Sequence, residues 1–402
     1  MSTPARPRAL LLENIHDDGA FTLREAGFDV ERVVGALGED DLVDALDGVA
    51  VLGIRSNTQL TERAVKSATS LIGVGAFCIG TNQIDLAACS EAGVAVFNAP
   101  FSNTRSVVEL AISEIIALTR RLTDKNADMH AGVWDKSAVG SHEVRGRRLG
   151  IVGYGNIGSQ LSVLAEALGM SVLFYDSADK LALGNARRCG TLDELLAEAD
   201  VVTLHVDGRA GNNLLFGQEQ FARMRRGSIF LNLSRGFVVD HGALRRHVES
   251  GHLVGAAVDV FPVEPKSKGE QFVSELRGLR NVILTPHVGG STEEAQQDIG
   301  AFVAGKLRDY AAAGTTSLSV NLPPVALPET PGAQRLLLLH GNTPGVLAKV
   351  NGALAEHGIN VEAQMLGTRG PLGYVVTDVA EAGRVVPVLQ AMPETVRLRV
   401  LP

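Results

Sequence analysis

Short apolar runs alternate with amphipathic segments along most of the chain. In the first hundred residues, a helical pattern covers Leu60–Ala68. The apolar runs typical of strands are Ala9–Leu12, Val49–Ile54, Leu71–Val74 and Val94–Phe97. Strands that alternate with helices in this way predict βαβ units and a parallel sheet.

A second alternating series begins with an expected strand at Leu149–Gly153. The next segment carries Leu161, Leu164, Ala165 and Leu168, the spacing of a helix that packs on a sheet. The later strands are expected at Ser171–Tyr175, Val201–His205, Ser228–Leu233, Gly255–Val260 and Val282–Thr285. The fold class that we predict is therefore α/β, with two Rossmann-like or flavodoxin-like parallel-sheet domains.

The pattern changes at residues 321–332, where four prolines predict a stiff, extended linker. A compact βαββαβ pattern follows it. Its segments are Gln334–His340, Gly345–Glu356, Ile359–Leu366, Gly373–Val379, Arg384–Gln390 and Thr395–Leu401. A module this small, placed after a linker, is expected to regulate or to assemble the protein.

Composition narrows the functional classes. The 402 residues are 45% hydrophobic and 20% charged, which suits two or three globular domains and excludes long disorder. The formal net charge of -8 argues against nonspecific nucleic-acid binding. No apolar run approaches a membrane span, no His or Cys spacing suits a metal, and the three cysteines suit a reducing compartment. We expect a soluble, cytoplasmic protein without a metal.

Residues 153–158 form a Gly-x-Gly-x-x-Gly loop between an expected strand and helix. Gly153 permits a tight turn, Gly155 lets the backbone approach a pyrophosphate, and Gly158 allows close helix–strand packing. The helix start at Asn156 and Ile157 offers free N–H groups to phosphates. The alternative, that these glycines only make a turn, is weaker because the whole strand–loop–helix context is present.

The next strand ends in Asp176, at about the spacing expected for a residue that binds the adenosine ribose. Its charge would repel a 2′-phosphate, and no arginine follows it directly. NAD is therefore the expected cofactor rather than NADP.

Three residues farther along the chain complete a candidate active site. Arg235 lies in Ser-Arg-Gly, Glu264 in Glu-Pro and His287 in Pro-His-Val-Gly-Gly. A histidine can take an alcohol proton, a carboxylate can orient the imidazole, and an arginine can grip a substrate carboxylate with two hydrogen bonds. The chemistry suits oxidation of a 2-hydroxy acid.

This order of motifs resembles the D-2-hydroxyacid dehydrogenase family. The resemblance implies that Arg235 binds and polarises substrate, that Glu264 supports the histidine, and that His287 is the acid–base. It also places Asp259 near the nicotinamide carboxamide. The further residues expected at the cofactor are Leu233, Ser234 and Gly290, together with Arg235 and His287.

The likeness is narrower still for one branch, whose members oxidise 3-phosphoglycerate and carry a C-terminal ACT domain. Residues 80–85, 98–107 and 132–134 resemble that branch. The resemblance implies a discontinuous substrate-binding domain at the cleft. The expected domains are 1–103 with 292–320 for substrate, 104–291 for NAD, 321–332 as linker and 333–402 as a ferredoxin-like ACT domain.

The same resemblance assigns the substrate contacts to Arg55, Ser56 and Asn103. Lys136 corresponds to a basic residue that reaches a neighbouring subunit's site. Asn57 stands where close relatives have a second basic residue. Loss of one charged hydrogen bond weakens binding by about 1.5–3 kcal/mol. We therefore expect Asn57 to change the affinity for the substrate more than its identity.

In the tail, His340, Asn342 and Asn360 resemble the L-serine-binding signature of paired ACT domains. Donors and acceptors of this kind suit an amino acid. Alternatively, Asn342 only caps a helix that starts at Pro344. The branch implies a homotetramer. It also implies that the enzyme catalyses the first step of serine biosynthesis and is feedback-inhibited by L-serine.

Two other functions remain open from the sequence. The same chemistry can serve another 2-hydroxy acid, for example formation of 2-hydroxyglutarate from 2-oxoglutarate, because Arg55 can hold any second anionic group. From a different class, NAD(H)-sensing corepressors resemble this fold. The tail and Arg55 speak against that class.

Overall fold

The computed structural model describes residues 6–265 and 269–402. Two compact units divide the chain, Met1–Ser102 with Gln296–Pro402 and Asn103–Ala295. The C-terminal sheet falls in the same unit as the first sheet. The assignment of three domains with separate tasks therefore stays a prediction.

The first unit contains a five-stranded parallel sheet in the order β2-β1-β3-β4-β5. This is the flavodoxin-like order, in which helices lie on both faces of the sheet. The strands are β1 (Arg8–Leu11), β2 (Asp29–Arg32), β3 (Val49–Ile54), β4 (Gly73–Ala76) and β5 (Ala95–Asn98).

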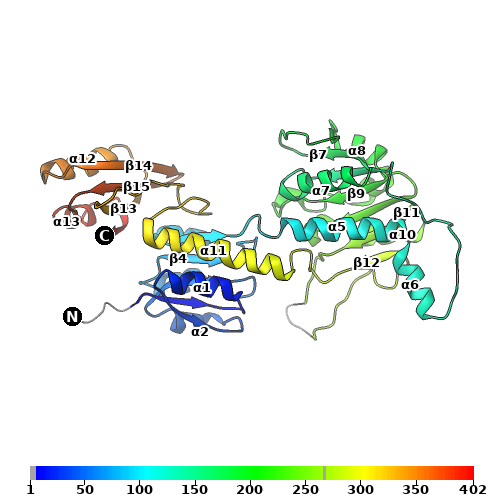
Figure 1. Ribbon diagram of the computed structural model, residues 1–402, viewed down its shortest axis with the longest axis horizontal. Helices are drawn as coiled ribbons and strands as arrows, with labels where there is room; N and C mark the ends of the chain where they lie inside the picture. The colour runs from blue at the N-terminus through cyan, green and yellow to red at the C-terminus, as the bar shows by residue number, and fades with distance from the viewer. Residues whose placement is uncertain (1–5, 266–268) are drawn as a thin grey trace. The chain divides into compact units, whose positions relative to one another are not determined.

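Helices cover both faces of this sheet (Figure 1). On one face, α1 (Asp17–Glu25) and α11 (Glu293–Ala313) enclose a core with Leu11, Val51 and Phe97. The other face carries α2 (Glu39–Ala45), α3 (Glu62–Ser67) and α4 (Leu86–Glu91). Helix α11 comes late in the chain, so this sheet is completed only by a returning segment.

The second unit is built on a seven-stranded parallel sheet in the order β12-β11-β10-β9-β6-β7-β8. Successive strands are added on one side of β6 up to β8 and then on its other side from β9, a reversal of strand order that is typical of dinucleotide-binding sheets. The strands are β6 (Arg148–Val152), β7 (Ser171–Tyr175), β8 (Arg187–Arg188), β9 (Val201–Leu204), β10 (Ser228–Asn232), β11 (Leu253–Val258) and β12 (Val282–Leu284).

Two layers of helices enclose the second sheet as well. One face packs on α5 (Thr104–Thr119) and α7 (Asn156–Ala167). The other packs on α8 (Leu192–Glu198), α9 (Gln218–Arg223) and α10 (His241–Glu249). The short helix α6 (Leu122–His130) follows α5. Both expected parallel-sheet folds are thus confirmed.

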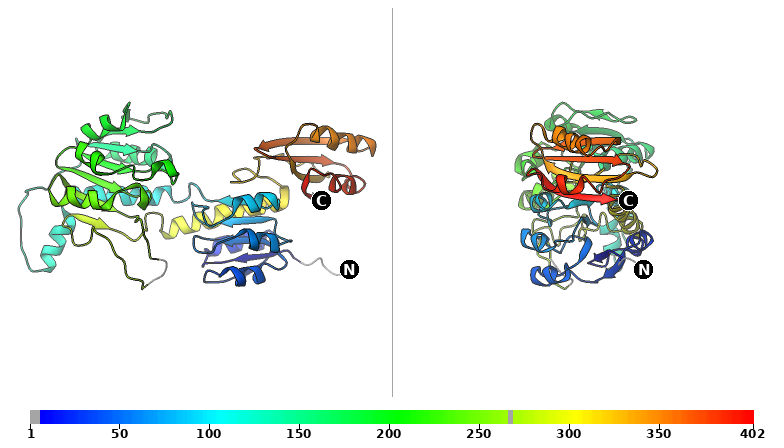
Figure 2. Two further views of the ribbon diagram at one scale, coloured as in Figure 1. Left: turned by 180° about the vertical axis from the view of Figure 1, so that it is seen from behind. Right: turned by 90° about the vertical axis from the view of Figure 1, so that its left-hand side faces the viewer.

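The C-terminal sheet is antiparallel, in the order β14-β15-β13-β16. Its βαββαβ succession is the expected one, and α12 and α13 pack on one of its faces (Figure 2). The elements are β13 (Gln334–Gly341), α12 (Val346–Glu356), β14 (Val361–Arg369), β15 (Leu372–Val379), α13 (Val386–Gln390) and β16 (Thr395–Leu401). On the opposite face, the buried hydroxyl of Tyr374 donates to the carbonyl of Gly314 (2.7 Å).

Two strands were not expected from the sequence. Both β2 and β8 lie at a sheet edge and have polar, exposed residues, so no apolar run marks them. The strand expected at Leu71–Val74 is also displaced, because β4 begins at Gly73. Leu71 is buried but precedes the strand, so the apolar run in the sequence begins before the residues that pair in the sheet.

The expected linker is only partly free of the core. Its first residue, Asn321, accepts a hydrogen bond from the Val96 N–H (2.8 Å) and donates to the Val94 carbonyl (2.9 Å). Leu322 and Val325 are buried in the first core. Residues 321–325 therefore belong to the packed structure, and the prediction of a linker over them was wrong. Proline content indicates extended backbone but not whether it is buried.

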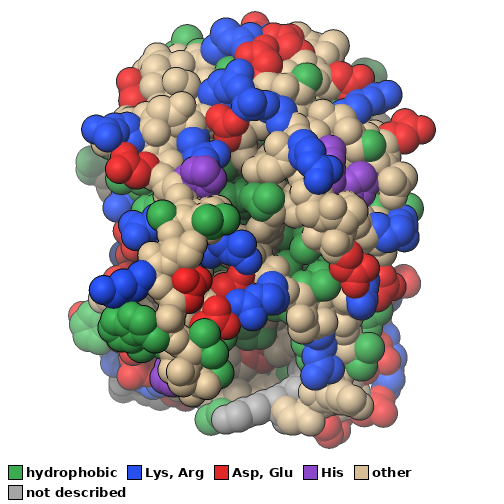
Figure 3. Space-filling model, turned by 90° about the vertical axis from the view of Figure 1, so that its right-hand side faces the viewer, with side chains coloured by type: hydrophobic (Ala, Val, Ile, Leu, Met, Phe, Trp, Pro, Cys, Tyr) green, Lys and Arg blue, Asp and Glu red, His purple; other side chains and the backbone are tan. Residues whose placement is uncertain are grey.

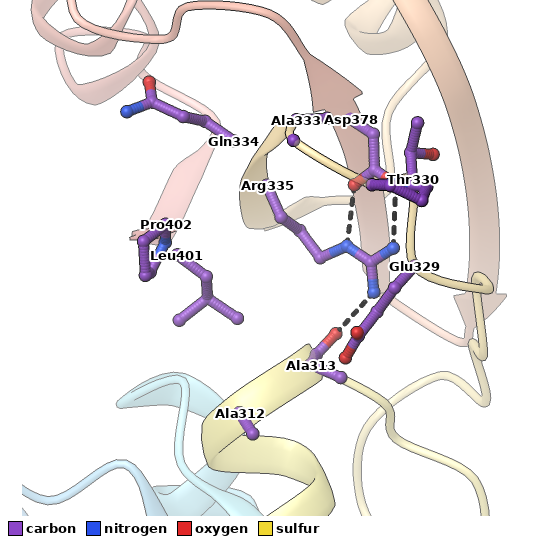
Figure 4. A pocket seen from close by; sticks show the side chains of 12 residues that line it. Ala312, Ala313, Glu329, Thr330, Ala333, Gln334, Arg335, Asp378, Leu401 and Pro402 are labelled. Atoms are coloured by element: carbon purple, nitrogen blue, oxygen red, sulfur yellow. Dashed lines mark hydrogen bonds and ion pairs between the residues drawn. The ribbon is translucent and has the colours of Figure 1, made fainter.

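A pocket of about 730 Å³ lies where α11, the segment 329–333 and the C-terminal sheet meet (Figure 4). Arg335 lies beside it and forms a two-bonded ion pair with buried Asp378 (2.7 and 2.8 Å). The same guanidinium donates to the carbonyls of Ala313, Leu327 and Pro328. Because the guanidinium of Arg335 is hydrogen-bonded to Asp378 and to three backbone carbonyls, it stabilises the contact between the C-terminal sheet and the segments before it. It is not a candidate for binding a ligand.

Among the described residues, no helix is long and apolar enough to cross a membrane. Acidic and basic side chains are interspersed on the face drawn in Figure 3.

We predict that Asp378→Ala destabilises the C-terminal sheet by about 3–5 kcal/mol, because it leaves a buried guanidinium without its counter-charge. Native-state hydrogen exchange of β15 amides measures this local free energy of opening. The control is Glu356→Gln, an exposed neutralisation at the end of α12, with an expected effect below about 0.5 kcal/mol. An equally small effect for Asp378→Ala would show that the ion pair adds no net stability.

Candidate active site

The glycine loop follows β6 and opens α7, at the edge where the strand order reverses. Gly153 has a φ of +93°, and a Cβ there would lie 2.5 Å from the carbonyl oxygen of His205. A Cβ at Gly158 would overlap the carbonyl oxygen of Gly153. Both positions therefore need glycine for the fold itself.

Gly155 differs from the other two glycines, because it is the N-cap of α7 and nothing lies within 4 Å of where its Cβ would be. The open space lies at the start of the helix, beside the N–H groups of Asn156 and Ile157. A pyrophosphate fits this position, since helix N-termini bind anions with free N–H groups and a positive dipole end.

Asp176 follows β7 and organises the adjoining loops. Its carboxylate accepts hydrogen bonds from the N–H groups of Tyr154 and Ala178, each at 2.8 Å. Arg188 lies near this turn, but it pairs with Asp179 (2.6 Å). That arginine was missed from the sequence because it lies on β8, an edge strand without an apolar signature.

The Ser-Arg-Gly segment follows β10 and is held by a buried asparagine. Asn232 Oδ1 accepts from the N–H (3.1 Å) and hydroxyl (2.8 Å) of Ser234, and its Nδ2 donates to the Arg235 carbonyl (3.1 Å). Leu233 is also buried. A Cβ at Gly236 would overlap the backbone of Phe261, so the segment is tied to the loop that carries Glu264.

Glu264 and His287 form a close pair. The Oε2 of Glu264 lies 2.9 Å from His287 Nδ1, and its Oε1 accepts from the Phe261 N–H (2.9 Å). The imidazole is half-exposed. This hydrogen bond occupies Nδ1 and leaves Nε2 as the nitrogen that can exchange a proton with a ligand.

The surroundings shift both pKa values. The hydrogen bond to Glu264 raises the pKa of His287; burial opposes it, the charges of Glu264 and Asp259 add to it, and Arg235 opposes it. Burial acts to raise the pKa of Glu264, but the hydrogen bonds from His287 and Phe261 and the nearby positive charges bring it below its ordinary value. The three residues Arg235, Glu264 and His287 are therefore electrostatically coupled.

Asp259 follows β11 and holds the loop around His287. Its Oδ1 accepts from Thr285 Oγ1 (2.6 Å) and the Val288 N–H (2.9 Å), and its Oδ2 accepts from the Gly289 N–H (2.8 Å). His287 itself has a φ of +54°, an uncommon conformation for a residue with a side chain. The contact that was expected between Asp259 and the nicotinamide stays a prediction.

The remaining expected residues of this unit lie in two places. The side chain of Asn103 occupies the space where Gly290 would carry a Cβ, so Asn103 lies against the histidine loop. Lys136 lies on an exposed loop, with its Nζ 5.9 Å from the centroid of the Trp134 ring. Trp134 is 71% exposed, so it does not serve as packing within the described chain.

Arg55 and Ser56 belong to the first unit, directly after β3. Arg55 is partly exposed, whereas Ser56 and Asn57 are exposed. The structure places these residues at the carboxyl end of a parallel strand, where ligands of α/β sheets bind.

Of the expected serine-binding residues, His340 and Asn342 lie at the carboxyl end of β13, and Asn360 lies between α12 and β14. Asn342 donates to the Gly370 carbonyl (3.1 Å), and Asn360 is exposed. His340 is buried, with Nδ1 2.8 Å from the Gly341 carbonyl. The N-cap of α12 is Gly345, without a side-chain cap, so the alternative that Asn342 caps a helix starting at Pro344 was wrong.

Fold and site together define the class as an NAD-dependent 2-hydroxyacid dehydrogenase. Residues 112–289 match the model described as the NAD-binding domain of D-isomer-specific 2-hydroxyacid dehydrogenases. Residues 336–397 match the AHAS small subunit-like ACT domain. More narrowly, the chain belongs to the family of D-3-phosphoglycerate dehydrogenases.

The narrower assignment rests on long, close relatives. The chain is 50% identical to the D-3-phosphoglycerate dehydrogenase of Haemophilus influenzae over 396 residues, covering 98% of this chain and 96% of the relative. It is 47% identical to the enzyme of the same name from Escherichia coli K12, covering 98% and 97%. Among solved structures, it resembles Aquifex aeolicus D-lactate dehydrogenase complexed with NAD and lactic acid. That match has a TM-score of 0.65 and 25% identity, and covers 75% of this chain and 95% of the other.

Two glycine substitutions should separate folding from cofactor binding. Gly155→Ala has room in the fold but intrudes where the pyrophosphate would lie, so NAD affinity should fall about tenfold or more with an unchanged melting temperature. Gly158→Ala should lower both, because its Cβ meets backbone. Calorimetric titration with NAD and thermal melts measure the two quantities.

Gly35→Ala, another open position without a positive φ, is the control. Full NAD affinity in Gly155→Ala would place the pyrophosphate elsewhere.

Proposed function

We propose that this chain uses NAD to oxidise 3-phospho-D-glycerate to 3-phosphooxypyruvate, the first step of L-serine biosynthesis. The observation that carries the proposal is the His287–Glu264 pair beside Arg235, on a dinucleotide-binding sheet. The names of the close relatives support the choice of substrate.

NAD supplies the acceptor for the hydride that leaves C2 of the substrate. His287 takes the hydroxyl proton at Nε2, because Nδ1 is committed to Glu264. The carboxylate of Glu264 then stabilises the imidazolium that forms. The raised pKa of His287 suits the reverse reaction, in which the same proton returns to the substrate.

Arg235 binds the substrate carboxylate and polarises the carbonyl that forms at C2. A guanidinium can do this with two parallel hydrogen bonds. Asn103, whose side chain lies against Gly290, adds a neutral donor. The contacts of the reacting centre thus come from the second unit.

The phosphate of the substrate is assigned to Arg55 and Ser56. No hydrogen bond or ion pair occupies the Arg55 guanidinium in the part of the chain that the structure describes, so its charge is available. Asn57 adds a polar side chain but no charge. Lys136 is assigned to the site of a neighbouring subunit in a homotetramer, and exposed Trp134 supports an interface at its loop.

The C-terminal domain is assigned to feedback by L-serine. Paired tails would bind the amino acid through His340, Asn342 and Asn360. Asn342 and Asn360 are accessible, whereas His340 would act from a buried position. Inhibition requires that serine bind the open and closed enzyme differently.

A second candidate reaction is reduction of 2-oxoglutarate to 2-hydroxyglutarate. The guanidinium of Arg55 favours it, because a carboxylate can replace the phosphate as the distal anionic group.

The first prediction from this function is that 3-phospho-D-glycerate and NAD yield NADH, and that L-serine lowers the rate while D-serine does not. Absorbance at the NADH band measures both. The variants Asn342→Ala and Asn360→Ala should keep the uninhibited rate and lose the response to serine. A rate that serine leaves unchanged would remove the feedback role from the tail, and no turnover would redirect the assay to 2-oxoglutarate with NADH.

The second prediction concerns pH. Oxidation needs a neutral imidazole, and the raised pKa of His287 keeps it protonated to higher pH, so kcat/KM falls as the pH drops through that pKa. Glu264→Gln removes the negative charge, so the pKa of His287 should fall and the acid limb should move to lower pH. The plateau rate should fall about tenfold or more, because the imidazolium loses its partner.

Glu219→Gln, an exposed neutralisation on α9, is the matched control and should leave the profile unchanged. An acid limb that stays in place in Glu264→Gln would mean that another group titrates there.

A further inference from the structure

A buried carboxylate lies beneath the segment that carries Arg55. Glu13 follows β1, is 7% exposed, and has a φ of +59°. Its Oε1 accepts from the N–H groups of Arg55 (3.1 Å) and Thr58 (2.9 Å), and its Oε2 accepts from the Asn57 N–H (2.9 Å). One side chain thus satisfies three backbone donors of a loop that is neither helix nor strand.

The carbonyl side of the same loop is also held. Gln83, 7% exposed, donates from Nε2 to the Arg55 carbonyl (2.6 Å). The backbone carbonyl of Gln83 accepts from the Leu60 N–H (2.8 Å). Since both the N–H and the C=O of Arg55 are bound to buried side chains, its backbone is fixed, whereas its guanidinium has no hydrogen bond or ion pair among the described residues.

The charges in this arrangement are unusual. A buried carboxylate beside an arginine would ordinarily form an ion pair with it, because hydrogen bonds between two charged groups are stronger than those to a neutral N–H. Here Glu13 bonds to backbone N–H groups, and no ion pair to Arg55 is found in the described chain. The loop turns its N–H groups inward to Glu13 and its side chains at Ser56 and Asn57 outward.

From this geometry we infer that Glu13 is a positioning residue: it fixes the Arg55–Thr58 loop so that the guanidinium of Arg55 binds the distal anionic group of the substrate. Gln83 completes the frame from the carbonyl side. The inference rests on the proposed role of Arg55. It goes beyond that role, because it assigns anion affinity to a buried residue that does not touch substrate.

The substitution Glu13→Gln tests this inference because positioning and simple electrostatics predict opposite results. Removal of a negative charge near an anion site would by itself tighten binding. Loss of one acceptor oxygen, with an amide N–H facing a backbone N–H, would instead release the loop. We expect the KM for 3-phospho-D-glycerate to rise about tenfold or more, with kcat and the KM for NAD within about twofold of wild type.

Two further readouts accompany the kinetics. Hydrogen exchange of the peptide that contains residues 55–58 should be faster in Glu13→Gln than in wild type. Inorganic phosphate should inhibit competitively, with a larger inhibition constant than for wild type. The control is Glu25→Gln, which neutralises an exposed carboxylate of α1 and should change none of these. A KM that is unchanged or lower in Glu13→Gln would overturn the inference.

Failure of the proposed function would look different. In that case wild type itself would not turn over 3-phospho-D-glycerate, and the loop would be tested by hydrogen exchange and by the KM for 2-oxoglutarate. If Glu13→Gln does not fold, Gln83→Met removes the bond to the Arg55 carbonyl and leaves Glu13 in place; the longer contacts of Gln83 Nε2 with Cys78 Sγ (3.3 Å) and the Gly80 carbonyl (3.4 Å) are lost with it. It should raise the same KM by a smaller factor, and a wild-type KM in that folded variant would overturn the inference.

Discussion

The candidate site depends on the carboxylate of Asp259, which holds the histidine loop to the end of a parallel strand. Three donors from residues 285–289 converge on its two oxygens, and His287 takes an uncommon positive φ between them. A buried carboxylate must be satisfied by hydrogen bonds to be stable, and here the donors are the loop itself. The position of the imidazole relative to Glu264 follows from that constraint.

The same solution recurs at other strand ends. Asp176 binds the N–H groups of Tyr154 and Ala178, and Glu264 binds that of Phe261. Parallel strands deliver several loops to one edge, where unpaired backbone N–H groups need acceptors. Acidic side chains therefore do two jobs in this fold: they order the loops, and they set the charge around the bound ligands.

Sequence reasoning reached the fold and the residues that the structure brings together at His287, because both leave local patterns. Apolar runs marked the inner strands, and short motifs marked Arg235, Glu264 and His287. The edge strands β2 and β8 left no such pattern. Residues 321–325 were wrongly predicted to be a linker, because proline content does not indicate whether a segment is buried. Glu13 was missed for a related reason. Its partners lie more than forty residues away, so its role exists only in three dimensions.

Helix α11 also has a consequence for the order in which the protein can be assembled. The first sheet needs this helix to cover Leu11, Val51 and Phe97, yet α11 is synthesised after the whole second unit. The second unit is one continuous segment and can complete its core as soon as it leaves the ribosome. Until α11 is synthesised, α1 alone covers that face of the first sheet, so the nascent N-terminal segment keeps part of its apolar surface exposed while the second unit is made.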